Sequence, residues 1–267
     1  MGLIMTTIRQ ANVAGLFYPD NPAELGSQIR GYLAQAPAEI SASRPKALIA
    51  PHAGYIYSGP IAASAYRQLQ PIADQISRVI ILAPAHRMAF RGLAVSEAEE
   101  FETPLGKVEV DCDALLRLQA LAQVRQVEPA FANEHSIEVQ LPFLQTALQE
   151  FKIVPLLVSN ANAEQVSQVL ELLWGGPETL IVISSDLSHY LSYEQAKSID
   201  KTTTQAIEAL QPSALSLEQA CGGIPIQGLL LSAKHHNLHV TTLDLRNSGD
   251  TAGTKDRVVG YGAYVFS

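Results

Sequence analysis

Short hydrophobic runs recur along the chain, and each is bounded by turn residues. A short run that lacks alternating polar positions is typical of a strand buried on both faces, as in the parallel sheets of α/β proteins. We therefore predict central strands over residues 46–50, 78–83, 153–159 and 180–184.

Helical patterns lie between these runs, and polar capping residues or Pro stand at several of their starts. They predict helices over residues 22–35, 60–69, 114–122, 136–149, 163–173 and 225–236. Two further strand patterns, at residues 239–245 and 258–266, are close enough in sequence to pair antiparallel. The alternation predicts a layered α/β fold, with helices on both faces of a mixed, largely parallel sheet.

Composition favours one large domain. Of the 267 residues, 47% are hydrophobic and 16% are charged, which provides ample material for a buried core. Chains of about 250 residues built on one sheet often form a single domain. The Pro/Ala/Ser-rich stretch at residues 36–45 predicts a surface loop rather than a linker, so we expect one domain over residues 1–267.

Charge and hydropathy exclude several kinds of partner. The net charge of −8 disfavours contact with nucleic acid and with anionic membrane surfaces. The hydrophobic runs are far shorter than a transmembrane helix, and the first residues lack the features of a secretory signal. Two cysteines are too few for a disulfide framework. We expect a cytoplasmic protein that contacts neither nucleic acid nor membrane.

Histidines follow three of the predicted strands. His52, His86 and His189 each come shortly after a hydrophobic run, and ligands of open α/β sheets bind outside the carboxyl ends of the strands. One such histidine alone is more often a capping or hydrogen-bonding residue, but three together predict a pocket. Imidazole suits zinc, copper and iron, and Cys221, in a turn of small residues before a helix that would stabilise its thiolate, could complete the ligand set.

Other polar residues near these positions have two readings. Asp186 and His189 are three residues apart, so they could share a helix face, with the carboxylate orienting an imidazole; they could instead be capping residues. We favour His189 as a proton-transfer group and Asp186 as a metal ligand or as a residue that orients one. His135 stands at a predicted helix start but could point into the pocket. For His235, His236 and His239 we favour a plain interaction with a helix carboxyl terminus.

Five motifs together resemble the Memo family: residues 15–19 (GLFYP), 51–59 (PHAGYIYSG), 103–106 (TPLG), 134–138 (EHSIE) and 184–190 (SSDLSHY). The resemblance runs from about residue 8 to the end of the chain. It implies an α/β/α sandwich similar to the class III extradiol dioxygenases. It also implies that His52, His86 and Cys221 form a metal pocket, and that His189 corresponds to the dioxygenases' acid/base residue.

The resemblance leaves the reaction open, because a Memo-like site offers a thiolate where those dioxygenases use a carboxylate. A thiolate favours copper, iron or zinc. Our first hypothesis is an Fe(II)- or copper-dependent oxidoreductase of dioxygenase-like type, with a zinc hydrolase as a variant. The alternatives are a module that binds a peptide or small molecule, an accessory to a radical-SAM partner, and a metal-free enzyme in which Cys221 is the nucleophile.

Overall fold

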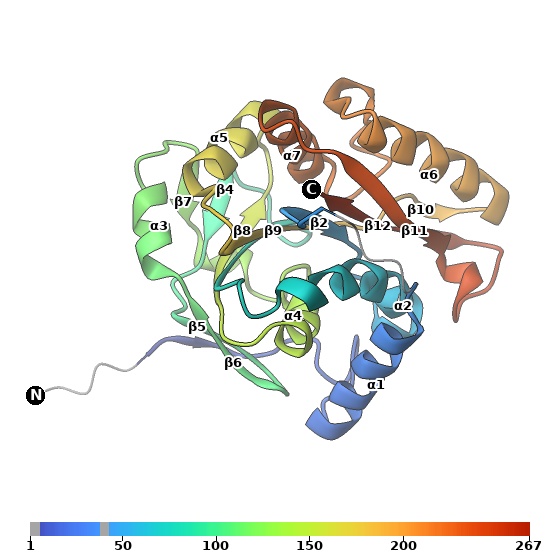
Figure 1. Ribbon diagram of the computed structural model, residues 1–267, viewed down its shortest axis with the longest axis horizontal. Helices are drawn as coiled ribbons and strands as arrows, with labels where there is room; N and C mark the ends of the chain where they lie inside the picture. The colour runs from blue at the N-terminus through green and yellow to red at the C-terminus, as the bar shows by residue number, and fades with distance from the viewer. Residues whose placement is uncertain (1–5, 38–42) are drawn as a thin grey trace, which may run out of the picture.

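Twelve strands form one mixed sheet in the part of the chain that this computed structural model describes, residues 6–37 and 43–267 (Figure 1). In chain order they are β1 (Ile8–Arg9), β2 (Ala47–Ala50), β3 (Arg78–Pro84), β4 (Leu93–Val95), β5 (Glu100–Thr103), β6 (Gly106–Val110), β7 (Val124–Gln126), β8 (Lys152–Val158), β9 (Thr179–Ser184), β10 (His189–Leu191), β11 (Val240–Asn247) and β12 (Val258–Phe266).

The sheet is parallel at its centre and mixed at its margins. Across it the order is β1-β5-β6-β8-β3-β9-β2-β12-β10, while β11 pairs with β12, β4 with β8, and β7 with β4. The central strands β8, β3, β9 and β2 are mutually parallel. Strand β12 runs antiparallel to β2, β10 and β11, which confirms the predicted mixed sheet.

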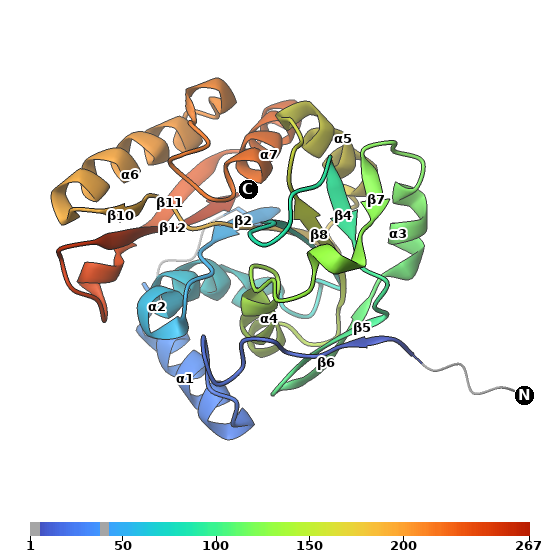
Figure 2. The ribbon, with the colours of Figure 1, turned by 180° about the vertical axis from the view of Figure 1, so that it is seen from behind.

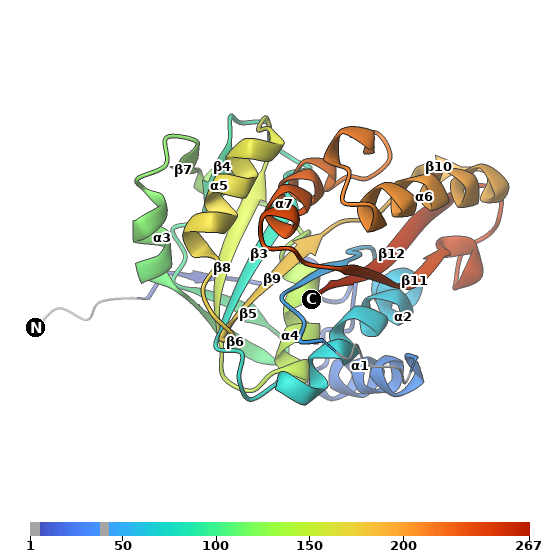
Figure 3. The same cartoon turned by 45° about the horizontal axis from the view of Figure 1, so that its top comes forward.

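Helices cover both faces of the sheet. They are α1 (Pro22–Gln35), α2 (Tyr55–Tyr66), α3 (Cys112–Leu118), α4 (Leu141–Ala147), α5 (Ala163–Leu173), α6 (Tyr193–Glu208) and α7 (Gly223–His235). One layer contains α1, α2 and α4, and the other contains α3, α5, α7 and α6 (Figures 1 and 3). In the second layer α7 lies between α5 and α6, as Figure 2 also shows from behind. The α/β/α sandwich is therefore confirmed.

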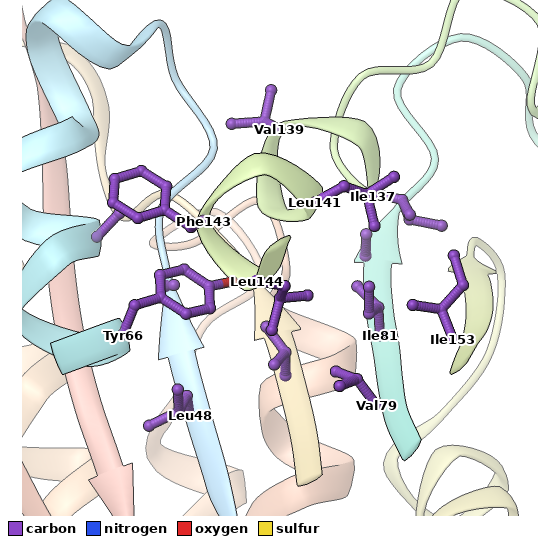
Figure 4. Close-up of a cluster of buried hydrophobic side chains, with 14 of the residues drawn as sticks. Leu48, Tyr66, Val79, Ile81, Ile137, Val139, Leu141, Phe143, Leu144 and Ile153 are labelled. Carbon is purple, nitrogen blue, oxygen red and sulfur yellow. The ribbon is translucent and has the colours of Figure 1, made fainter. Parts of the chain in front are cut away.

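Successive residues of the central strands enter opposite cores, which explains why their sequences are continuously hydrophobic. In β3, Val79 and Ile81 belong to one buried cluster, whereas Ile80 and Leu82 belong to the other. Figure 4 shows the first cluster, in which α4 lies over the strands and the ring of Phe143 stacks on Tyr66 with centroids 5.1 Å apart. The sheet is buried on both faces, as its sequence predicts.

Two helices have the predicted bounds because their starts are capped. Asn21 accepts hydrogen bonds from the N–H groups of Ala23 and Glu24 at the start of α1. Asn162 and Gln165 form a capping box at the start of α5. The predicted strands 46–50, 78–83, 153–159 and 180–184 each agree with β2, β3, β8 and β9 to within one residue.

Other predicted helices differ in extent. The one predicted over 60–69 begins at Tyr55, because Pro60 lies within α2 rather than at its first turn, and a 3-10 helix, η1 (Arg67–Ile72), continues it. The one predicted over 136–149 is irregular as far as Ile137, then forms η3 (Glu138–Gln140) and α4. Helix α6 and the short marginal strands were not predicted, and part of the predicted loop 36–45 lies outside the described residues.

Three more 3-10 turns, η2 (Glu128–Ala130), η4 (Pro212–Ala214) and η5 (Ser248–Asp250), lie in connections. No helix within residues 6–37 and 43–267 is both long and apolar enough to cross a membrane.

Candidate metal centre

Three imidazoles meet at the carboxyl edge of the central strands. His52 follows β2 and His86 follows β3, and because these strands run parallel both histidines leave the sheet at the same edge. His135, from the loop before η3, packs against both, with ring centroids 5.5 Å from His52 and 5.0 Å from His86. One ligand nitrogen from each ring lies within 4.8 Å of the other two. These residues therefore form a candidate metal-binding group.

A hydrogen-bond chain assigns the tautomer of His52. The side-chain amide of Gln140 donates to the carbonyl of Pro51 and also to Oγ of Ser184, at 2.8 Å. Ser184 in turn donates its proton to the carbonyl of Ser136, so its Oγ can only accept from Nδ1 of His52, 2.8 Å away. Nδ1 of His52 is thus protonated, and Nε2 keeps the lone pair that a metal requires.

Glu134 fixes the second imidazole in the same manner. Its Oε1 lies 3.0 Å from Nδ1 of His86, and the carboxylate also accepts the backbone N–H groups of His86, His135 and Ser136. Burial alone would raise the pKa of Glu134, but the hydrogen bonds from the ring of His86 and from the backbone hold it well below its usual range. The ionised carboxylate therefore keeps the proton of His86 on Nδ1 and leaves Nε2 free.

Burial keeps His52 and His135 neutral. Desolvation, with the neighbouring His86, lowers the pKa of His52 to about 3. Desolvation, with the neighbouring His52, lowers the pKa of His135 to about 4. Neutral imidazole is the form that binds a metal, so the protein holds two of the three rings ready for ligation at neutral pH.

Cys221 adjoins this group without belonging to it. Its Sγ lies 3.3 Å from Nε2 of His52 and 3.3 Å from the backbone nitrogen of Asp186. The expected stabilisation of its thiolate by the helix start is wrong for the metal-free protein: burial, followed by the charge of Asp186, raises the pKa of Cys221 to about 12. The residue is half-buried and precedes the helix cap Gly222 rather than lying in the first turn, and desolvation of the thiolate outweighs the helix dipole.

Asp186 and His189 lie around the histidines, but not on one helix. Residues 185–188 are irregular and β10 begins at His189, so the expected shared helix face is wrong. Oδ1 of Asp186 accepts the backbone N–H of His52 at 2.8 Å, and burial raises the pKa of this carboxyl. His189 is half-buried and close enough to influence the pKa of both Asp186 and His52.

The hydrogen-bond partners that hold the imidazoles were not predicted from the sequence. Ser184, Gln140 and Glu134 were not singled out, although Glu134 directly precedes His135. Glu138, also missed, accepts hydrogen bonds from the backbone of Asn12 and Val13 and from the hydroxyl of Tyr18. It thereby fastens the segment that carries Phe17, whose ring centroid lies 4.7 Å from that of His135.

The residues that form this centre lie within a similarity to known proteins that spans most of the chain. The family model described as Memo-like protein matches residues 9–265. The chain belongs to the Memo family. It is 35% identical over 272 residues to a MEMO1 family protein of Aquifex aeolicus, covering 97% of this chain and 99% of that protein. It is 37% identical over 275 residues to one of Thermotoga maritima, covering 95% and 97% of the two chains.

A third relative is similar over almost the whole chain. This chain is 35% identical over 272 residues to a MEMO1 family protein of Methanosarcina mazei, covering 97% of this chain and 98% of that protein. Residues 51–59, 134–138 and 184–190 of this chain supply His52, Glu134, His135, Ser184 and Asp186 to the centre. Neutral imidazoles with fixed tautomers, and a thiol beside them, fit a transition-metal ion.

Proposed function

We propose that this Memo-family protein is a metal-dependent oxidoreductase, with Fe(II) or copper as the metal and an organic small molecule as the substrate. His52 and His86 would be two ligands, and His135 or Cys221 the third. The supporting observation is that Ser184 and Glu134 each fix a proton on Nδ1, so that Nε2 of both histidines is free to ligate. When bound, such an ion supplies one-electron redox chemistry, whereas zinc would supply only Lewis acidity.

The surrounding residues suit proton transfer and substrate placement. His189 is half-buried at the margin of the centre, so it can exchange protons between a bound substrate and solvent. Asp186 is buried, and its bond to the backbone of His52 keeps that histidine in position. The ring of Phe17 gives an apolar wall beside His135 against which an organic substrate can pack.

Metal titration under anaerobic conditions tests the centre. We expect the tag-free protein to bind one equivalent of Fe(II) or Cu(I) at this centre, and His52→Ala to lose that equivalent. His135→Ala and Cys221→Ser identify the third ligand, since the variant that loses the ligand binds more weakly. His239→Ala, in which an exposed imidazole is removed, is the matched control.

Turnover is a separate measurement. With the metal bound, we expect oxygen consumption that depends on an added reductant or substrate and falls in His189→Ala while metal affinity is retained. Tight binding without turnover in any screen would favour the alternatives, a small-molecule or peptide binding module or an accessory to a radical-SAM partner. Absence of binding in the wild type would exclude the proposed metal centre itself.

A further inference from the structure

A second group of ligating side chains lies at the far end of α7. Glu171 of α5 and His235 and His236 at the end of α7 place one ligand atom each within 4.8 Å of one another. Helix α7 starts beside Cys221 and ends at His235, and its 13 residues correspond to about 20 Å of helix. This group is therefore distinct from the first centre.

The carboxylate of Glu171 has one oxygen paired and one oxygen unpaired. Oε2 lies 2.9 Å from Nε2 of His236. Oε1 is buried and has no hydrogen-bond partner among the described residues. A buried acceptor without a partner is unusual in proteins. An ion pair between two helices would account for Oε2, but it leaves Oε1 and the nearby ring of His235 unexplained.

The ring of His236 is held in place by its neighbours. It stacks on Trp174 with centroids 3.8 Å apart and an interplanar angle of 7°. It also stacks on the ring of His235, with centroids 4.9 Å apart and an interplanar angle of 25°. The carboxyl end of α7 also lies here, and the partial negative charge of a helix end favours cations. A ring fixed in this way loses little freedom on binding an ion.

We propose that Glu171, His235 and His236 bind a divalent transition-metal ion, with Zn²⁺ as the ion of best fit. Two imidazoles and one carboxylate are a common zinc ligand set. Tetrahedral Zn²⁺ with ligands at about 2.1 Å separates its ligand atoms by roughly 3.4 Å, so the 2.9 Å pair needs only a small opening. The ion takes the place of the proton between Glu171 and His236, so that His236 ligates through Nε2 and carries its ring proton on Nδ1.

The chain carries a reporter for this group alone. Trp174 is its single tryptophan, and it stacks directly on His236. Ligation of His236 therefore changes the indole fluorescence, whereas an ion at the first centre leaves it unchanged. The inference does not depend on the proposed function, and the two can fail separately.

The test is a Zn²⁺ titration of the tag-free double variant His52→Ala/His86→Ala, followed by tryptophan fluorescence and calorimetry. We expect one equivalent to bind together with a fluorescence change. The same fluorescence titration on the wild type gives the result even if the double variant folds poorly. No saturable fluorescence response in either protein would overturn the proposal.

Ligand variants make the assignment specific. Glu171→Gln keeps the volume of the side chain but removes its charge, and His235→Ala removes one imidazole. Because even residues behind the ligands contribute tenfold or more to metal affinity, each variant should weaken Zn²⁺ binding by about tenfold or more. His239→Ala, an exposed histidine three residues beyond His236, should leave binding unchanged. A response as strong in Glu171→Gln as in the wild type would also overturn the proposal.

Discussion

The first centre depends on side chains that contact the histidines rather than the metal. Hydrogen bonds made by Gln140, Ser184 and Glu134 settle which atom donates and which accepts at each contact. These bonds determine which nitrogen of each imidazole carries the proton. Substitutions at these positions therefore test the centre without removing a ligand.

Glu134→Gln should weaken metal binding by about 10- to 100-fold, the usual cost of losing a partner behind a ligand. A glutamine amide would turn N–H groups toward the backbone donors of His86, His135 or Ser136, so His86 would lose its fixed orientation. The dissociation constant from an anaerobic titration measures the effect. Glu97→Gln, at an exposed position, should bind like the wild type.

Ser184→Ala should lower the free energy of unfolding of the metal-free protein by about 1–3 kcal/mol. It removes the partner of the Nδ1–H of His52, of one N–H of the Gln140 amide and of the carbonyl of Ser136 at a fully buried position. Urea unfolding monitored by circular dichroism measures the change. The exposed substitution Ser216→Ala should stay within about 0.5 kcal/mol of the wild type, and a similar value for Ser184→Ala would contradict the assigned network.

Lys46 should make stability increase with pH above neutrality. Its Nζ donates to the carbonyls of Trp174, Gly176 and Thr179, and burial lowers the pKa of Lys46 from 10.5 to about 8. Between these values the unfolded chain binds the proton that the folded chain has released, so unfolding becomes harder as pH rises through this window. Below pH 8 both states are protonated and the destabilising effect of burying the charge is complete.

Denaturant unfolding of the wild type and of Lys46→Met at pH 7.5 and pH 10 measures this effect. We expect the unfolding free energy of the wild type, measured relative to that of Lys46→Met, to be larger at pH 10 than at pH 7.5. An equal change in both proteins would show that Lys46 titrates as an ordinary exposed lysine.

At the scale of elements, prediction succeeded where one local signal decides the structure. Helices α1 and α5 begin at asparagine caps and match their predicted bounds. Strands buried on both faces are recognisable because every position is apolar. Residues 136 and 137 were predicted to be helical but are irregular. The carboxylate of Glu134 accepts N–H groups from three residues, an arrangement that only the folded chain can form.

The contact between α5 and α7 requires a glycine. A Cβ added at Gly228 would lie 2.3 Å from a methyl carbon of Val166. We expect Gly228→Ala to destabilise the protein by about 1–3 kcal/mol through overpacking, as measured by urea unfolding.

Gly31→Ala is the matched control within α1. No atom lies within 4 Å of a Cβ placed there, and alanine forms helix more readily than glycine by about 1 kcal/mol. This substitution should therefore be neutral or stabilising. If Gly228→Ala also lost no unfolding free energy, the contact between α5 and α7 would have room for a Cβ, and the predicted overpacking would be wrong.

At the scale of the molecule, the first centre is assembled from distant segments. His52, His86, His135 and Cys221 come from four separate parts of the chain. The strand-end positions of His52 and His86 were predictable, because parallel strands end at a common edge. The approach of Cys221 to His52 was not, since it depends on where α7 packs.

Because the unfolded chain lacks this arrangement, metal binding should stabilise the fold. At a free metal concentration 100 times the dissociation constant, the expected gain is about 2.7 kcal/mol. Anaerobic thermal unfolding with and without Fe(II), against a chelator-treated sample, measures it. In a Glu171→Gln background, where the second group is weakened, the gain should vanish on adding His52→Ala, and a gain that persists there would place the bound ion elsewhere.

The position of β12 affects how the chain folds during synthesis. It is the last strand in chain order, yet it pairs with β2, near the start, and with β10 and β11. Until the ribosome has released it, β2 presents a bare hydrophobic edge, the kind of surface that recruits other chains. During synthesis this edge therefore needs protection until β12 has emerged and paired with β2.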